Sequence, residues 1–237
     1  MNESLEGLEI KVSEYRCDKC RDMTFIIDEG VAIPCACRQV RIAEDILIKS
    51  GISEEFRNKR FSNFVYDIEK QIIYAYKEAC NYSRNFKNIE KDRCNSIIFM
   101  GQVGCGKTHL SLAIANELMD EGVGVVYMSY REVVTKLKQN IMDEVYYNRV
   151  INRYKNARVL LIDDLFKGRI SDSDVNIIFE IVNHRYFNNL PLIVSSEKSV
   201  EELIGIDEAI GSRLIEMSKN YLVKIIGKKL NFRIYGK

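Results

Sequence analysis

Proline is scarce in this sequence, with two in 237 residues, which argues against a proline-rich linker between domains. Long apolar runs are also missing: none approaches the roughly 18 residues that a transmembrane helix requires. The acidic first residues, 1–6, lack the apolar core of an export signal. We therefore expect a cytoplasmic protein with no membrane partner.

An excess of charge of one sign is missing too, because 35 basic and 34 acidic residues leave a net charge of +1. Bulk charge therefore implies no polyanionic partner, and any nucleic-acid site must be a local patch. Hydrophobic residues make up 46% and charged residues 29%, which is typical of a globular protein. The length suits one full-size domain with a small module.

Four of the seven cysteines lie close together near the N-terminus, as C-x2-C, a 14-residue gap and C-x-C: Cys17, Cys20, Cys35 and Cys37. Four thiolates are a ligand set that tetrahedral zinc prefers. Short apolar runs on either side of residues 28–30 predict a hairpin that returns the second pair to the first. We predict a zinc module over residues 1–56, with thiols that hold no metal as the alternative.

Apolar runs alternate with helical stretches from residue 96 onward. The runs are Ile97–Met100, Val123–Ser129, Val159–Ile162, Leu192–Ser195 and Tyr221–Ile226. This alternation predicts an α/β fold with a mainly parallel five-stranded sheet flanked by helices, over residues 57–237. Apolar spacing also predicts helices over 38–56, 67–86 and 173–187.

A phosphate-binding loop is the strongest motif, because residues 101–108 match G-x-x-x-x-G-K-[ST] in full, between a predicted strand and a predicted helix. The backbone N–H groups of such a loop cradle the β- and γ-phosphates. Lys107 would neutralise phosphate charge, and the hydroxyl of Thr108 would reach Mg2+. The predicted nucleotide-binding residues are Gly101, Gln102, Val103, Gly104, Cys105, Gly106, Lys107, Thr108 and the following His109.

Two acids, Asp163 and Asp164, close the buried run Val159–Ile162. Ligands of open α/β sheets bind at the carboxyl ends of the strands. We predict that Asp163 holds Mg2+ and that Asp164 orients the attacking water. An acidic pair can instead cap a helix, but beside the phosphate loop it favours a nucleotide hydrolase or switch.

Several segments resemble the DnaC/DnaI-type helicase loaders of bacteria and phages. They are Cys17–Asp22 with Cys35–Arg38, Arg60–Phe64, Gly104–Leu110, Leu161–Leu165 and Gly211–Leu214. The resemblance implies an AAA+ core with slow, switch-like ATPase activity. It also implies a hexameric DnaB-type replicative helicase as partner, which the protein would deliver onto single-stranded DNA. The lack of an N-K-x-D motif after Asp164 agrees with ATP rather than GTP.

The resemblance also assigns three further residues. Arg213 matches the arginine finger, which reaches the γ-phosphate of a neighbouring subunit and implies self-association; a surface ion pair is the alternative. Many members have asparagine where this chain has Glu197, so Ser196 is our substitute for the first sensor. Arg233 is a candidate second sensor or a solvated tail charge.

A local basic stretch, residues 145–162, contains no acid and interleaves cations with tyrosines. Cations hold the backbone of single-stranded DNA, and aromatic rings stack its bases. The candidate contacts are Arg149, Arg153, Lys155, Tyr146 and Tyr147. The alternative is a solvated helix face with the tyrosines in the core.

Two other functions stay open. An IstB-type transposition ATPase shares the core and would bind duplex DNA and a transposase, but the four cysteines in front of the core favour the loader.

A small-molecule kinase usually has a mobile Arg-rich lid. We find no such lid between Asp164 and Leu192, where only Lys167 and Arg169 lie near a turn.

Overall fold

The computed structural model of the protein describes residues 15–28, 30–38, 40–42, 45, 54–66, 69–227 and 230–235. The first part holds a hairpin in which β1 (Phe25–Asp28) pairs antiparallel with β2 (Val31–Pro34). This confirms the hairpin predicted between the cysteine pairs. Of the helix expected over 38–56, the described residues between 37 and 45 are helical, and α2 (Glu54–Arg57) overlaps the end of the expected range. The rest lies outside the described residues.

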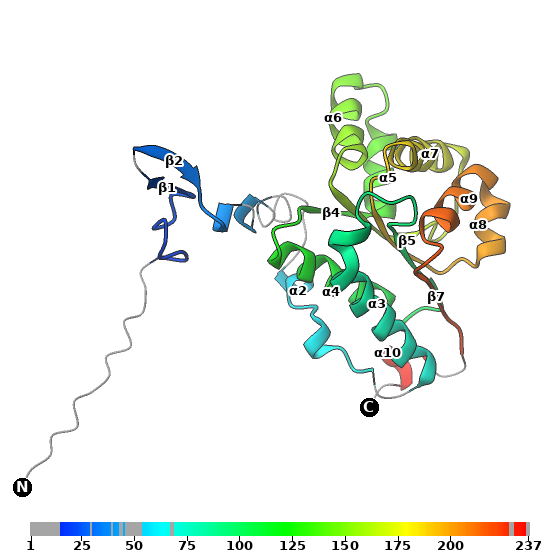
Figure 1. The fold of residues 1–237 in the computed structure, drawn as a ribbon. Coiled ribbons are helices and arrows are strands. Elements are labelled where there is room, and N and C mark those ends of the chain that lie inside the picture. The colour runs from blue at the N-terminus through cyan, green and yellow to red at the C-terminus, as the bar shows by residue number, and fades with distance from the viewer. Residues whose placement is uncertain are drawn as a thin grey trace, which may run out of the picture.

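A parallel sheet forms the centre of the larger part (Figure 1). It has five strands in the order β4-β5-β6-β3-β7. The strands are β3 (Ile97–Gly101), β4 (Val125–Ser129), β5 (Val159–Leu165), β6 (Leu192–Ser196) and β7 (Leu222–Ile225). Nearly all of their residues are buried, as expected of parallel strands that are covered on both faces. The predicted parallel sheet is confirmed.

Helices cover both faces of this sheet. They are α3 (Lys70–Ile89), α4 (Lys107–Asp120), α5 (Tyr130–Gln139), α6 (Glu144–Lys155), α7 (Asp172–Phe187), α8 (Val200–Ile206), α9 (Glu208–Met217) and α10 (Phe232–Tyr235), with a 3-10 turn η1 (Phe61–Asn63). Successive strand residues alternate between two cores, with Phe99 facing α3 and α4 and Met100 facing α5 to α9. The helix expected over 67–86 begins and ends three residues later, since its apolar face continues to Ile89.

The order of the strands in the sheet determines where the phosphate loop and the acids after the buried strand lie. The central strand β3 lies between β6 and β7, and β5 lies on the other side of β6. The carboxyl ends of β3, β5 and β6 therefore meet at one edge, where ligands of such sheets bind. Within the ranges that the structure describes, no helix is both long and apolar enough to cross a bilayer.

Candidate nucleotide site and cysteine cluster

The loop between β3 and α4 depends on glycine at two positions with a left-handed backbone. Gly104 has φ +75°, and a Cβ there would lie 2.1 Å from Oδ1 of Asn231. Gly106 has φ +93°, and its Cβ would lie 2.8 Å from the ring of Phe64. Glycine is the residue that adopts this conformation without steric cost. The loop thus keeps the compact path that the motif predicts.

Lys107 is buried inside this loop. Its Nζ donates to the carbonyl oxygens of Gly101, at 2.7 Å, and Gln102, at 2.8 Å. The thiol of Cys105 lies 4.0 Å from the same nitrogen and is fully buried, and this burial raises the pKa of Cys105. The loop therefore holds one cation at its centre, while Cys105 packs into the core.

The carboxylate of Asp163, at the end of β5, accepts hydrogen bonds from three hydroxyl groups. Thr108 Oγ1 donates to its Oδ1 at 2.9 Å and Ser195 Oγ at 2.5 Å, while the hydroxyl of Tyr127 donates to its Oδ2 at 3.2 Å. Desolvation raises the pKa of Asp163, although these hydrogen bonds oppose the rise. The two residues predicted to hold Mg2+ thus lie in contact, and their oxygens are the donors that Mg2+ prefers.

A cavity of about 330 Å³ opens beside the loop. It is lined by Glu55, Phe56, Lys59, Val103, Gly104, Gly106, Lys107, Thr108, His109, Asp164, Lys167, Glu197 and Arg233. Residues far apart in the sequence, such as Asp164 and Arg233, therefore meet at the phosphate loop. The sequence analysis missed five of these lining residues: Glu55, Phe56, Lys59, Lys167 and Glu197. The signal for the first three was their place just before the segment Arg60–Phe64.

His109 joins the loop helix to that segment. Its Nε2 lies 3.0 Å from the carbonyl oxygen of Arg60 and 3.1 Å from Oδ1 of Asn63, and its ring contacts Phe64 edge-on. Burial lowers the pKa of His109, which favours the neutral ring. Residues 60–64 are thereby held against one wall of the cavity.

Ser196, predicted to be a sensor, does not line this cavity. Its side chain is fully buried, where Oγ donates to the carbonyl oxygen of Leu165 at 2.8 Å and accepts from the N–H of Lys198 at 3.1 Å. Its neighbour Ser195 instead donates to Asp163 and accepts from the N–H of Asp164 at 2.8 Å. Because successive side chains of a strand face opposite ways, the structure places Ser195 rather than Ser196 at the site.

Arg213 lies on α9, and none of the residues around it lines the nucleotide cavity. Its guanidinium carbon is 5.5 Å from the ring centre of Phe179, 5.3 Å from that of Tyr186 and 5.9 Å from that of Phe187. Nη1 donates to the carbonyl oxygen of Ala209 at 2.9 Å. This arginine is half-buried and has no carboxylate partner among the described residues. The surface ion pair considered as the alternative to an arginine finger is therefore not formed.

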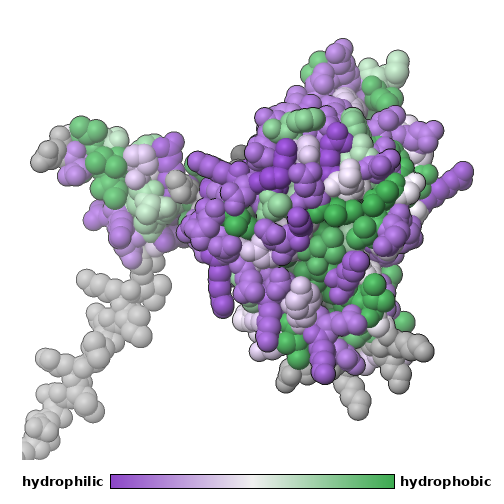
Figure 2. All heavy atoms as spheres, turned by 45° about the vertical axis from the view of Figure 1, so that its right-hand side comes forward, coloured by the Kyte–Doolittle hydropathy of each residue, from purple (hydrophilic) through white to green (hydrophobic). Residues whose placement is uncertain are grey.

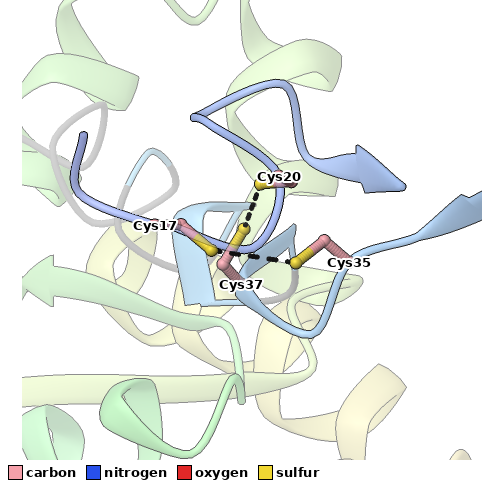
Figure 3. Close-up of side chains that lie close together, drawn as sticks. All are labelled: Cys17, Cys20, Cys35 and Cys37. Carbon is pink, nitrogen blue, oxygen red and sulfur yellow. Dashed lines mark hydrogen bonds between the residues drawn. The ribbon is translucent and has the colours of Figure 1, made fainter. Parts of the chain in front are cut away.

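The four clustered cysteines converge from the segment before β1 and the segment after β2 (Figure 3). Their Sγ atoms all lie within 4.8 Å of one another, with 3.8 Å between Cys17 and Cys35 and 3.3 Å between Cys20 and Cys37. Thiolates about 2.3 Å from one tetrahedral zinc ion would lie about 3.8 Å apart, so the cluster fits zinc. A hydrogen bond from the Cys20 backbone lowers the pKa of Cys17 to about 7, whereas burial raises the pKa of Cys37 to about 12.

The predicted DNA contacts all lie on α6 but differ in accessibility. Arg149 and Arg153 are exposed, and the guanidinium of Arg149 lies over the ring of Tyr146. Lys155 and Tyr147 are instead bound to Glu180, with contacts of 3.0 Å each. Part of the basic stretch thus serves the packing of α6 on α7.

A phosphate loop after β3, in contact with an acid at the end of β5 and with β6 between the two strands, is the arrangement of P-loop ATPases. The sheet is that of the AAA+ class. Residues 49–218 match the bacterial DnaA ATPase domain. The chain therefore belongs to the family of that domain, and its relatives place it with the DnaC-type members, which confirms the resemblance drawn from the sequence.

Three similar proteins illustrate the relationship. The chain is 36% identical to protein XkdC of the phage-like element PBSX of Bacillus subtilis (strain 168), over 96% of this chain and 90% of XkdC. It is 34% identical to the replicative helicase loader DnaC of Buchnera aphidicola subsp. Baizongia pistaciae (strain Bp), over 59% of this chain and 56% of DnaC. The crystal structure of DnaI has a TM-score of 0.60 at 23% identity, covering 75% of this chain and 93% of DnaI, and shares the fold.

Proposed function

We propose that this protein is an ATP-dependent loader, which binds a hexameric replicative helicase of the DnaB type and delivers it onto single-stranded DNA. The observation that carries the proposal is a four-cysteine cluster in the same chain as a full phosphate-loop motif whose Thr108 contacts Asp163. The relative named as a replicative helicase loader supports it. In this proposal the cysteine module holds the helicase, and ATP, bound with Mg2+ by Thr108 and Asp163, times its release.

The hairpin offers a surface for the helicase. Its strands expose every residue, and large apolar side chains among them are open to solvent, with Ile27 77% and Val31 63% exposed. Figure 2 shows apolar residues exposed on the part of the surface that the cysteine module forms, at the left of the view. Exposed apolar surface of this kind marks interaction sites in soluble proteins. We therefore place helicase binding on the module rather than on the ATPase core.

Co-migration with a DnaB-type hexamer on size exclusion tests this function. We expect one complex peak that contains both proteins in the presence of ATP and Mg2+. Absence of a complex, both with and without ATP, would contradict the loader. If the protein instead co-migrates with duplex DNA and a transposase, the transposition ATPase gains the support that the loader loses.

Arg213 gives a second expected result, because we propose that it completes the site of a neighbouring subunit. Arg213→Ala should leave ATP affinity of the monomer unchanged but reduce hydrolysis by the assembly on the order of 10³-fold, the contribution typical of arginine fingers. Calorimetry and phosphate release measure the two effects. Equal loss of affinity and hydrolysis would contradict a finger that acts in trans.

Mixing two variants sharpens this test. The Arg213→Ala subunit keeps an intact phosphate loop, and the Lys107→Ala subunit keeps an intact arginine finger. In a mixed assembly, some interfaces therefore join an intact loop of one subunit to an intact finger of its neighbour. We expect partial recovery of hydrolysis on mixing, above the strongly reduced rate of either variant alone. No recovery in assemblies shown to contain both variants would contradict action across the interface.

For single-stranded DNA we propose contacts by Arg149 and Arg153. Both are exposed, and they lie four residues apart on α6, so they share one face of the helix. The ring of Tyr146 lies beside Arg149 and supplies an aromatic face for a base. Lys155 and Tyr147 are weaker candidates, since Glu180 already binds both.

A further inference from the structure

Lys167 lines the nucleotide cavity between two carboxylates. Its Nζ lies 2.7 Å from Oδ2 of Asp164 and 3.3 Å from Oε1 of Glu197, and all three residues face the cavity that Lys107 and Thr108 also line. Asp164 is the residue predicted to orient the attacking water. The ammonium group is therefore paired with the candidate catalytic carboxylate itself.

The backbone holds Lys167 in this place through an unusual turn. Asp164 and Phe166 have φ of +56° and +58°, and the N–H of Lys167 donates to the carbonyl oxygen of Asp164 at 3.1 Å. Phe166 is fully buried and packs edge-on against Tyr130, which anchors the turn. Left-handed backbone at residues other than glycine is strained and persists chiefly at functional sites.

Glu197 explains why a cation is needed here. It follows β6 at the position where many relatives have an asparagine, as the resemblance implied, and a lone carboxylate would repel the γ-phosphate. The contact with Lys167 neutralises this carboxylate. The charges of Glu197, after β6, and of Lys167, three residues after Asp164, thus compensate each other.

We propose that Lys167 contacts the γ-phosphate of bound ATP and that Glu197 is its positioning residue. Without a triphosphate the ammonium group pairs with Asp164. When ATP binds, the ammonium group moves onto the γ-phosphate, Glu197 keeps it there, and Asp164 is released to orient water. The inference deepens the proposed function, since it rests on ATP being held by the phosphate loop, but it requires no helicase.

The test compares ATP with ADP, because only ATP carries the γ-phosphate. We expect Lys167→Met to weaken ATP binding about tenfold, the loss of one charge-assisted hydrogen bond, while ADP affinity stays within about twofold. Single-turnover hydrolysis should fall on the order of 10²-fold. Lys167→Arg should recover part of the preference for ATP. The matched control is Lys198→Met, since Lys198 pairs with Glu202 and lies outside the cavity.

Glu197 is tested by a double-mutant cycle. If Glu197 acts through Lys167, then Glu197→Gln should reduce hydrolysis in the wild-type background and have no further effect in the Lys167→Met background. Additive losses would overturn the positioning role. If wild-type protein binds ATP but Lys167→Met keeps the wild-type ratio of ATP to ADP affinity, the role of Lys167 is wrong and the proposed function is unaffected. If wild-type protein binds no ATP, the proposed function fails with it.

Discussion

Lys107→Ala should abolish ATP binding at concentrations that saturate the wild-type protein. The ammonium group lies at the centre of the loop, and without it the phosphate charge has no partner there. Loss of one partner of a buried charge pair costs about 3–5 kcal/mol, which corresponds to an increase in Kd on the order of 10²- to 10⁴-fold. Calorimetry with ATP and Mg2+ measures the change.

Lys87→Ala is the matched control for that variant. Lys87 pairs with Glu121 on the exposed face of α3, so its removal should leave ATP affinity unchanged. Thermal unfolding of both variants shows whether the fold survives. ATP binding by folded Lys107→Ala at wild-type affinity would contradict the role of this lysine in the loop.

Cys20→Ser should remove zinc and helicase binding together while sparing the ATPase core. Cys20 is buried in the cluster, and tetrahedral zinc cannot keep its four thiolates without it. Structural zinc contributes about 10–16 kcal/mol in small modules, so the cysteine module should unfold. We expect one zinc ion per wild-type chain and none in the variant, by elemental analysis, with no helicase complex on size exclusion.

Cys94→Ser is the control for this prediction, since Cys94 is half-buried and far from the cluster in the sequence. It should keep its zinc and its helicase binding. Unchanged zinc content in Cys20→Ser would contradict the four-cysteine site. Loss of ATP binding in Cys20→Ser would contradict the independence of the two parts.

Local sequence patterns predicted much of the fold and the phosphate-binding part of the nucleotide site. The phosphate loop is a continuous motif, and the five buried strands are apolar runs, so both could be recognised without knowledge of the tertiary structure. The contact between Thr108 and Asp163 also followed, because parallel strands bring their carboxyl ends to one edge.

Other parts of the site depend on tertiary detail that no local pattern contains. The pairing of β5 with β6 shifts its register between Ile162 and Leu165. The contact of Ser195 with Asp163 likewise depends on how these two strands pair. Phe56 reaches the cavity because α2 packs on α4, where Asn116 binds its carbonyl oxygen at 3.1 Å. Sequence spacing reveals neither arrangement. The boundary placed after residue 56 stays a prediction.

Calorimetry of the full chain with ATP, and with a slowly cleaved ATP analogue, tests the central claim most directly. That claim is that the loop of residues 101–108 binds the triphosphate while Asp163 and Thr108 hold its Mg2+. We predict heat from one site per chain for both ligands in the presence of Mg2+, and weaker binding when Mg2+ is chelated. The absence of heat from either ligand would contradict the claim.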